Sequence, residues 1–244
     1  MYNILISAGA AIAVLLILIF GFGMIWWGAL LVALTVMAGV VFLLMRNAMQ
    51  KLTDIFETAS KDLQAQRFEK AIRDLKDAKK MGKWQIFVES QLNSQIGMIY
   101  YMKRDFSNAF PYLQDSFFKN WVSSAMLAIC YMKRQKKDLM VKTFEKTVKW
   151  SPKEPLLWGI YAYCLNECGE ITKAKEAMEN GIKKLPSDQN LKANLENLQQ
   201  GKKMKMREYG DMWFQFHLES MAALQKHQMA TMGGRMKHRA TARR

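Results

Sequence analysis

Three cysteines and three histidines are the side chains of this 244-residue sequence best suited to metal or nucleophilic chemistry. Cys164 and Cys168 are four positions apart, so their thiols share one face of a helix. A structural zinc site needs four ligands, and no paired CxxC spacing supplies the others. Cys130 and Cys164 fall at equivalent positions of a longer repeat in the sequence, which favours packing between repeated elements over metal binding.

The histidines do not complete a catalytic group either. His217, His227 and His238 all lie near the C-terminus, away from the cysteines, and the sequence has no glycine-rich phosphate loop. We therefore predict no catalytic residue, no metal and no cofactor, and thiols that stay reduced in a cytoplasmic domain. The function should therefore come from a binding surface, which the helical elements of the chain must build.

The stretch "WGIYAYCLNECGEITKAKEAMENGIKKLP" predicts two helices, from about 156 to 168 and from about 171 to 184, with a left-handed cap at Gly169. Ala162 and Ala174 then face each other and allow a close helix pair, and Pro186 ends the second helix. Such a hairpin cannot bury both of its faces alone, which predicts that the chain repeats it.

The hairpin does recur. A single shift along the chain maps Ala162 onto Ala128 and Pro186 onto Pro152, and a slightly shorter step leads from Ala128 back to Gly97 in an earlier unit. A weaker fourth copy contains Ala59, Ala71, Leu75 and Ala78. Residues 52–200 thus resemble the tetratricopeptide repeat family, whose 34-residue helix-turn-helix carries Trp, Tyr, Ala, Phe and Pro at set positions. Met140 departs from this pattern, and a generic array of helical hairpins is the alternative.

The resemblance implies an all-α solenoid whose first helices line a concave groove for protein partners. The predicted groove is apolar and rich in methionine, which suits an apolar or amphipathic helical segment. It lacks the Lys, Arg and Asn ring with which chaperone-binding relatives hold a C-terminal carboxylate. About half of its residues are expected to be core between hairpins. The predicted groove residues are Gln91, Gln95, Met98, Tyr101, Met102, Met126, Ile129, Met132, Lys133, Ile160, Tyr163 and Asn166.

The N-terminal stretch up to Met45 carries no charged side chain, which predicts a transmembrane hairpin over 1–46 with spans of about 4–20 and 24–45. Gly21 and Gly23 permit the reversal between the spans. Arg46 and Lys51 follow the second span at once, so the positive-inside bias predicts cytoplasmic repeats. Small residues suit close packing of the two spans: Ser7, Ala11, Ala29 and Ala33. No proline or glycine interrupts 40–81, which predicts little or no linker before the repeats.

The C-terminal region is basic. The chain carries a net charge of +15, of which +7 lies from Lys202 onward. Residues 202–232 are predicted to form an amphipathic helix with Trp213 and Phe216 on its apolar face, which caps the solenoid, fills its groove, lies on the membrane or mediates dimerisation. Residues 233–244 are predicted to be a disordered tail that binds anionic lipid headgroups. Its basic residues are Arg235, Lys237, Arg239, Arg243 and Arg244.

These features together predict a bacterial-type inner-membrane protein with repeats over 47–201, in about four units, that acts as a scaffold for protein partners. The paired spans before the repeats resemble membrane-anchored repeat proteins of the HemY type in architecture alone. The alternative function is a membrane tether for nucleic acid or ribosomes through the basic C-terminal segment. No nucleic-acid-binding motif is recognisable, and basic residues near aromatics are also common on membrane-proximal surfaces.

Overall fold

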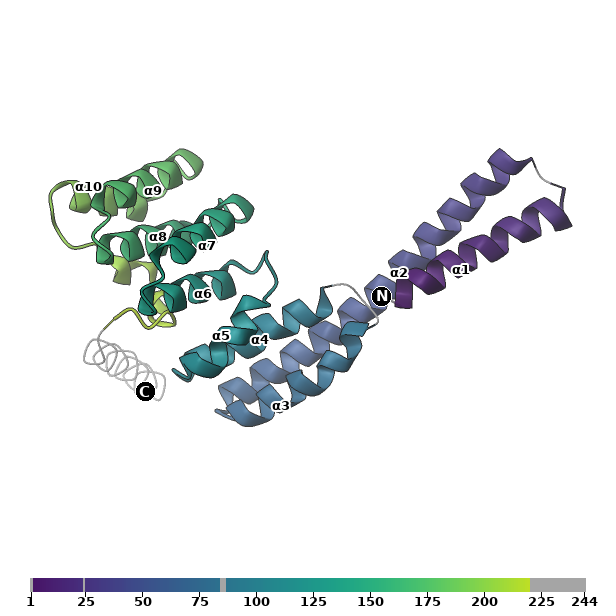
Figure 1. Cartoon of the computed structure of the whole chain (residues 1–244), viewed down its shortest axis with the longest axis horizontal. Helices are drawn as coiled ribbons and strands as arrows, with labels where there is room; N and C mark the ends of the chain where they lie inside the picture. Colours follow the sequence, from purple (N-terminus) through teal and green to yellow (C-terminus); the bar gives the residue numbers. More distant parts are fainter. Residues whose placement is uncertain (1, 24, 84–86, 220–244) are drawn as a thin grey trace, which may run out of the picture. The chain divides into compact units, whose positions relative to one another are not determined.

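The computed structural model describes residues 2–23, 25–83 and 87–219, and every regular element among them is helical (Figure 1). The chain divides into two compact units. The first contains residues 1–99 and 111–117, and the second contains residues 100–110 and 118–244. The fold is therefore all-α, as the sequence predicts.

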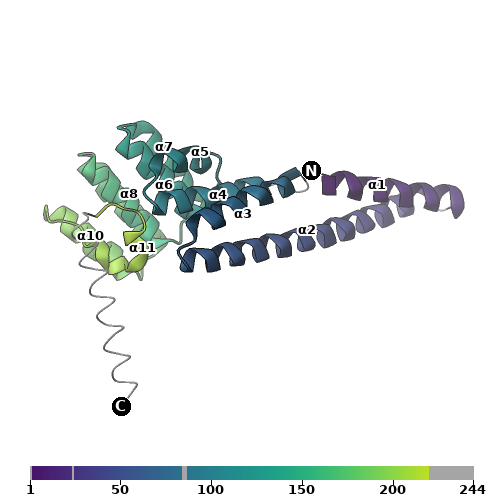
Figure 2. The same ribbon diagram turned by 90° about the horizontal axis from the view of Figure 1, so that it is seen from below.

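The two N-terminal apolar helices form a hairpin. Helix α1 (Tyr2–Leu16) continues as the π-helical turn η1 (Ile17–Gly21), and helix α2 (Trp26–Gln64) follows a reversal at Gly23, whose φ is 60°. The two helices lie side by side in both views (Figures 1 and 2). The small residues predicted at their contact are all buried: Ser7, Ala11, Ala29 and Ala33. Large apolar side chains such as Leu5 and Leu31 are exposed instead.

Helix α2 runs without interruption from the apolar stretch into the first repeat, as the lack of Gly and Pro predicts. After a turn at Gln66, whose φ is 59°, helix α3 (Phe68–Ala78) packs against α2. Three residues of the predicted fourth copy are buried there: Ala59, Ala71 and Leu75. The turn η2 (Lys79–Lys83) and helix α4 (Val88–Met102) follow.

Helix α5 (Phe106–Gln114) is short, with nine residues against fourteen in the equivalent helix of the next hairpin. A Cβ added to Gly97 of α4 would lie 2.8 Å from Leu113 Cδ2 of α5, which explains why a small residue stands at this helix contact. The short step in the sequence spacing between these two units therefore corresponds to a shorter second helix.

The next two hairpins repeat with a period of about 34 residues, the length of a tetratricopeptide unit. They consist of α6 (Trp121–Lys133) with α7 (Lys137–Trp150), and α8 (Pro155–Glu167) with α9 (Ile171–Lys184). Ala128, Ala162 and Ala174 are fully buried at the predicted positions, and Gly169 has the predicted positive φ of 79°. Met140 is also buried, so the core accepts a large side chain where the family pattern has a small one.

Helix α10 (Gln189–Gln199) packs against α8 and α9 and closes the last hairpin. The predicted continuous helix over 202–232 is wrong in its described part, 202–219. That part has no regular structure up to Lys205 and then forms only two short turns, η3 (Met206–Tyr209) and α11 (Asp211–Phe214). Positive φ values of 74° at Gly210 and 51° at His217 bound the second turn. Residues 220–232 lie outside the described residues.

Candidate peptide-binding face

Residues Met206–Glu219, here called the strap, lie across the first helices of the hairpins in the second unit. The Trp213 ring meets Tyr163 of α8 edge to face, with 5.0 Å between ring centroids. The Phe216 ring stacks on Trp121 at the start of α6, with 6.2 Å between centroids. The two strap side chains are only 1% and 0% exposed. The strap therefore crosses at least two successive hairpins, and we call the surface beneath it the first-helix face.

Tyr101, at the end of α4, holds the strap backbone. Its hydroxyl donates a buried hydrogen bond of 2.7 Å to the carbonyl oxygen of Phe216, 115 positions away. Its ring lies edge-on to Phe106 at 5.0 Å and stacks with His217 at 5.7 Å. Burial raises the pKa of the Tyr101 hydroxyl well above its usual value, so this group remains a hydrogen-bond donor.

His217 provides a second polar contact with α4. Its Nε2 lies 3.2 Å from the carbonyl oxygen of Met102, which can only accept, so Nε2 carries the proton. Its Nδ1 is buried without a hydrogen-bond partner among the described residues. Burial lowers the pKa of His217, and the nearby cations Arg104 and Lys133 lower it further. A neutral imidazole therefore suits this site.

The Lys133 ammonium contributes to the same environment. It lies 4.0 Å from the centre of the Phe106 ring, a cation–π distance. Although the residue as a whole is exposed, desolvation of its ammonium is the main reason why the pKa of Lys133 is lowered. Lys133 thus supports the His217 end of the strap through the Phe106 ring, and its positive charge disfavours protonation of His217.

An ion pair joins the two ends of the strap. Arg207 donates to both carboxylate oxygens of Glu219, at 3.2 and 3.0 Å, and the Trp213 indole N–H donates to the same carboxylate at 3.1 Å. The Arg207 hydrogen bond is the main cause that lowers the pKa of Glu219. One carboxylate therefore fixes both the strap's first turn and its buried indole.

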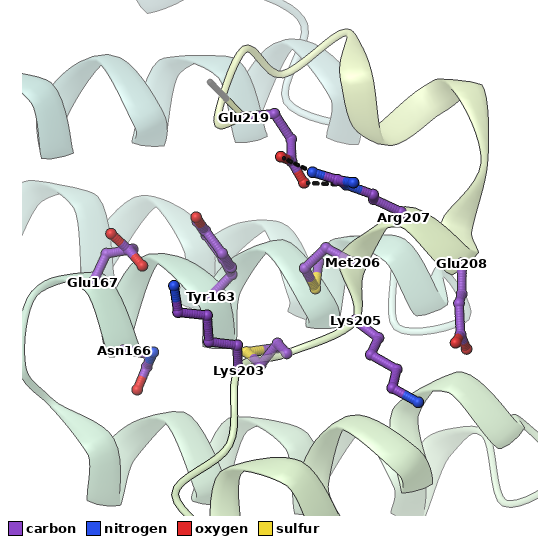
Figure 3. A pocket seen from close by; sticks show the side chains of 10 residues that line it. Tyr163, Asn166, Glu167, Lys203, Lys205, Met206, Arg207, Glu208 and Glu219 are labelled. Carbon is purple, nitrogen blue, oxygen red and sulfur yellow. Dashed lines mark hydrogen bonds and ion pairs between the residues drawn. The ribbon is translucent and has the colours of Figure 1, made fainter. Parts of the chain in front are cut away.

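A pocket of about 640 Å³ lies between the strap and α8 (Figure 3). Its walls mix apolar, basic and acidic side chains. Burial raises the pKa of Tyr163 in this wall to about 12. The residues lining it are Tyr163, Asn166, Glu167, Lys203, Met204, Lys205, Met206, Arg207, Glu208 and Glu219.

The predicted groove residues differ in how far the structure buries them. Three of them, on the part of α4 that belongs to the first unit, are half-buried: Gln91, Gln95 and Met98. Four of those in the second unit are buried: Tyr101, Met126, Ile129 and Ile160. Four more are half-buried: Met102, Met132, Tyr163 and Asn166. The remaining one, Lys133, is exposed. Only some of the predicted groove is therefore open to a partner, and the strap contacts Tyr101, Met102 and Tyr163 directly.

Sequence reasoning missed three residues of this face. Trp121 begins α6 directly after its cap residue Asn120, whose side chain accepts from the Ser123 amide, and no repeat pattern singles it out. Arg207 and Glu219 form their pair through the path of the strap, so only the folded chain identifies them. The basic tail residues, from Arg235 to Arg244, lie outside the described residues.

The cysteine thiols are poorly placed for reactivity. Cys130 and Cys164 are buried, and burial raises the pKa of Cys130 to about 11 and that of Cys164 well above its usual value. Burial also raises the pKa of Cys168, which is half-buried. A protonated thiol is a weak nucleophile and a weak metal ligand. Within residues 2–23, 25–83 and 87–219, no group of three His, Cys, Asp or Glu side chains is arranged to hold a metal.

No protein-family model and no curated protein matches the chain. Among solved structures, one described as "MamA RS-1 ArsTM double mutant" is 14% identical, with a TM-score of 0.47 over 68% of this chain and 94% of that one. Another, "MamA MSR-1 C2", is 14% identical, with a TM-score of 0.43 over 68% of this chain and 95% of that one. Similarities at this level are too low to assign a family or to transfer a function.

Proposed function

We propose that this chain is a membrane-anchored, tetratricopeptide-like scaffold that binds protein partners through the first-helix face. The observation that carries the proposal is the strap itself. This face holds a segment with little secondary structure by burying Trp213 and Phe216 and by bonding the Phe216 carbonyl, which is how a groove binds a peptide. The proposed role is recruitment of protein partners, and it assigns no reaction to the chain.

The proposed anchor is the α1–α2 hairpin. Both helices are long and apolar enough to cross a membrane, a criterion of length and composition. With 39 residues, α2 is about 58 Å long, roughly twice the ~30 Å hydrocarbon layer, so its second half extends beyond the bilayer. Arg46 and Lys51 lie near the middle of this helix, where the positive-inside rule favours the cytoplasm. We propose a bacterial-type inner membrane with cytoplasmic repeats.

The proposed second membrane contact is the basic tail. Arg235, Lys237, Arg239, Arg243 and Arg244 carry five positive charges with no acid between 233 and 244. Each contributes about 1 kcal/mol near an anionic leaflet, so they position the tail without anchoring it. Nucleic acid is the competing target for these charges.

Topology is tested first. A reporter fused after Arg244 should be active on the cytoplasmic side and inactive on the far side. Cys164 is buried, so its failure to react with a reagent in intact cells carries no topological information. A cysteine introduced at the exposed Phe22, in the reversal between the spans, should instead react from outside. Reaction of the reporter end from outside would overturn the proposed orientation.

Partner capture is tested second. Full-length protein purified from solubilised membranes should retain specific protein partners after nuclease treatment. A matched Trp121→Ala variant, altered in the first-helix face, should lose them while it remains in the membrane. Loss of all partners on nuclease treatment would overturn the scaffold proposal and favour a tether for nucleic acid or ribosomes.

A further inference from the structure

The strap has the properties of a bound ligand. Its two helical turns contain four residues each, far too few for a helix that is stable alone. Its order therefore depends on the surface beneath it. Long-range hydrogen bonds hold it at Phe216 and His217, while its own Arg207–Glu219 pair closes it at the rim.

The connection to the repeats is a simple tether. Residues 202–205 form no helix, and the Lys205 amide donates a 2.6 Å hydrogen bond to the buried side chain of Asn194 on α10. This bond fixes the point at which the strap begins. A segment tethered so closely has an effective concentration in the millimolar range, which keeps even a moderate binding site filled.

The contacts define what the first-helix face recognises. One site takes an indole against Tyr163, and a second takes an aromatic ring against Trp121, from positions three residues apart in the strap. At the second position, the Tyr101 hydroxyl donates a hydrogen bond to the backbone carbonyl of the same residue, Phe216, and every peptide carries such a carbonyl. The chemistry of the ligand is therefore Trp-x-x-Phe in a turn, without a required charge at its centre.

We propose that the first-helix face is a recognition site for a partner segment with Trp and Phe three residues apart, and that the strap is its built-in competitor. This inference rests on the proposed scaffold function and adds the class of partner and its regulation. A partner binds by displacing the strap, so the free protein is autoinhibited. The Arg207–Glu219 pair lies at the rim, where Arg207 is 59% exposed, and so it is the point at which displacement begins.

The test uses full-length protein in nanodiscs and a fluorescent peptide with the strap sequence "MREYGDMWFQFHLE". The Trp213→Ala/Phe216→Ala variant removes the resident side chains and leaves the first-helix face intact. This variant should bind the peptide at least about 10-fold more tightly than the unaltered chain, because the tethered competitor is gone. A control peptide in which both aromatic residues are alanine should bind neither protein.

A change in the face itself provides the matched control. Tyr101→Phe in the same variant keeps the buried ring and removes one hydrogen-bond donor. It should weaken peptide binding by about 2- to 10-fold, the usual range for one net hydrogen bond. Equal peptide affinity for the open variant and the unaltered chain would overturn the built-in competition. Partner capture that persists in that case would leave the scaffold function intact.

Hydrogen exchange keeps the proposal testable if the open variant does not fold. In the unaltered chain, strap amides should exchange by local opening, faster than the amides of α6 and α8. Exchange of strap and helices only together, by global unfolding, would show that the strap is permanent core. Light scattering of the unaltered chain completes the test, since a dimer formed by exchanged straps would make a second copy the occupant and overturn the intramolecular assignment.

Discussion

The contact between Trp158 and Gly181 makes Gly181→Ala an informative perturbation. An added Cβ would lie 2.8 Å from Trp158 Cγ, a distance that real Cβ atoms essentially never show, and 3.0 Å from the Trp158 Cβ, which is tighter than most real contacts. The indole has little freedom to move away. It is 6% exposed, and its N–H donates a 3.0 Å hydrogen bond to the Pro152 carbonyl.

Two effects of this substitution oppose each other. Alanine in the interior of α9 improves helix propensity by about 0.8–1.0 kcal/mol. Overpacking against a fixed side chain costs about 1–3 kcal/mol. We expect strain to win because the clashing atoms lie next to the Trp158 backbone rather than at a flexible end. The net loss in the free energy of unfolding should be about 1 kcal/mol, which lowers Tm by about 2–4 °C for a domain of 150–250 residues.

Thermal unfolding of full-length protein in nanodiscs, followed by circular dichroism, measures this loss. The control is a double-mutant cycle with Trp158→Ala, which removes Cγ and the ring, and so removes the atom that the new methyl group meets at 2.8 Å. In that background Gly181→Ala should be neutral or stabilising, because the propensity gain remains and most of the strain is gone. A higher Tm for the single Gly181→Ala variant would refute the close Trp158–Gly181 contact and with it the register of the α8–α9 hairpin.

Four further predictions concern packing, pH, thiols and the tail. Ala174 is fully buried, so Ala174→Leu should lower the free energy of unfolding by about 1–3 kcal/mol. The adjacent Lys173 is exposed, so Lys173→Leu should leave Tm nearly unchanged in the same thermal scans. The reverse order of the two effects would contradict the helix register. The pKa of His217 is lowered in the folded state, so its contribution to strap stability is present above the unfolded pKa of about 6.5 and is lost as the pH falls toward the lowered folded pKa. Hydrogen exchange of the strap amides should therefore accelerate as the pH falls through that window. The His217→Gln variant should not show this pH dependence. Maleimide should modify Cys168 in the folded chain and the other two thiols only after unfolding, as mass spectrometry would show. Deletion of residues 233–244 should weaken cosedimentation of the protein with anionic vesicles, with a steep salt dependence and no fall in Tm; salt-insensitive binding would argue against a charge-driven contact.

The repeats were predictable because their causes are local. Gly169 ends a helix through its own φ, and Ala128 and Ala162 recur at the same place in successive units because each hairpin needs a small side chain at the same contact. The buried Ala29 and Ala33 of the apolar hairpin follow the same logic. Uninterrupted helix propensity likewise predicted that α2 passes directly from the apolar stretch into the repeats.

The strap was not predictable in the same way. The spacing of Trp213 and Phe216 fits an amphipathic helix, and both side chains are indeed buried. The described segment nevertheless leaves the helix after Phe214, because contacts with α4, α6 and α8 hold it in another path. Helix α10, which directly follows the α8–α9 hairpin, packs against both of its helices.

The sequence by itself determined the all-α hairpins, their period and the apolar N-terminal pair, since helix periodicity, caps and small-residue contacts act over a few tens of residues. Only the tertiary structure decided which groove residues are covered and by what. The bond from Tyr101 to Phe216 joins positions 115 residues apart. No periodic pattern encodes such a pair, because it forms only when stacked hairpins bring the end of α4 beside the returning chain.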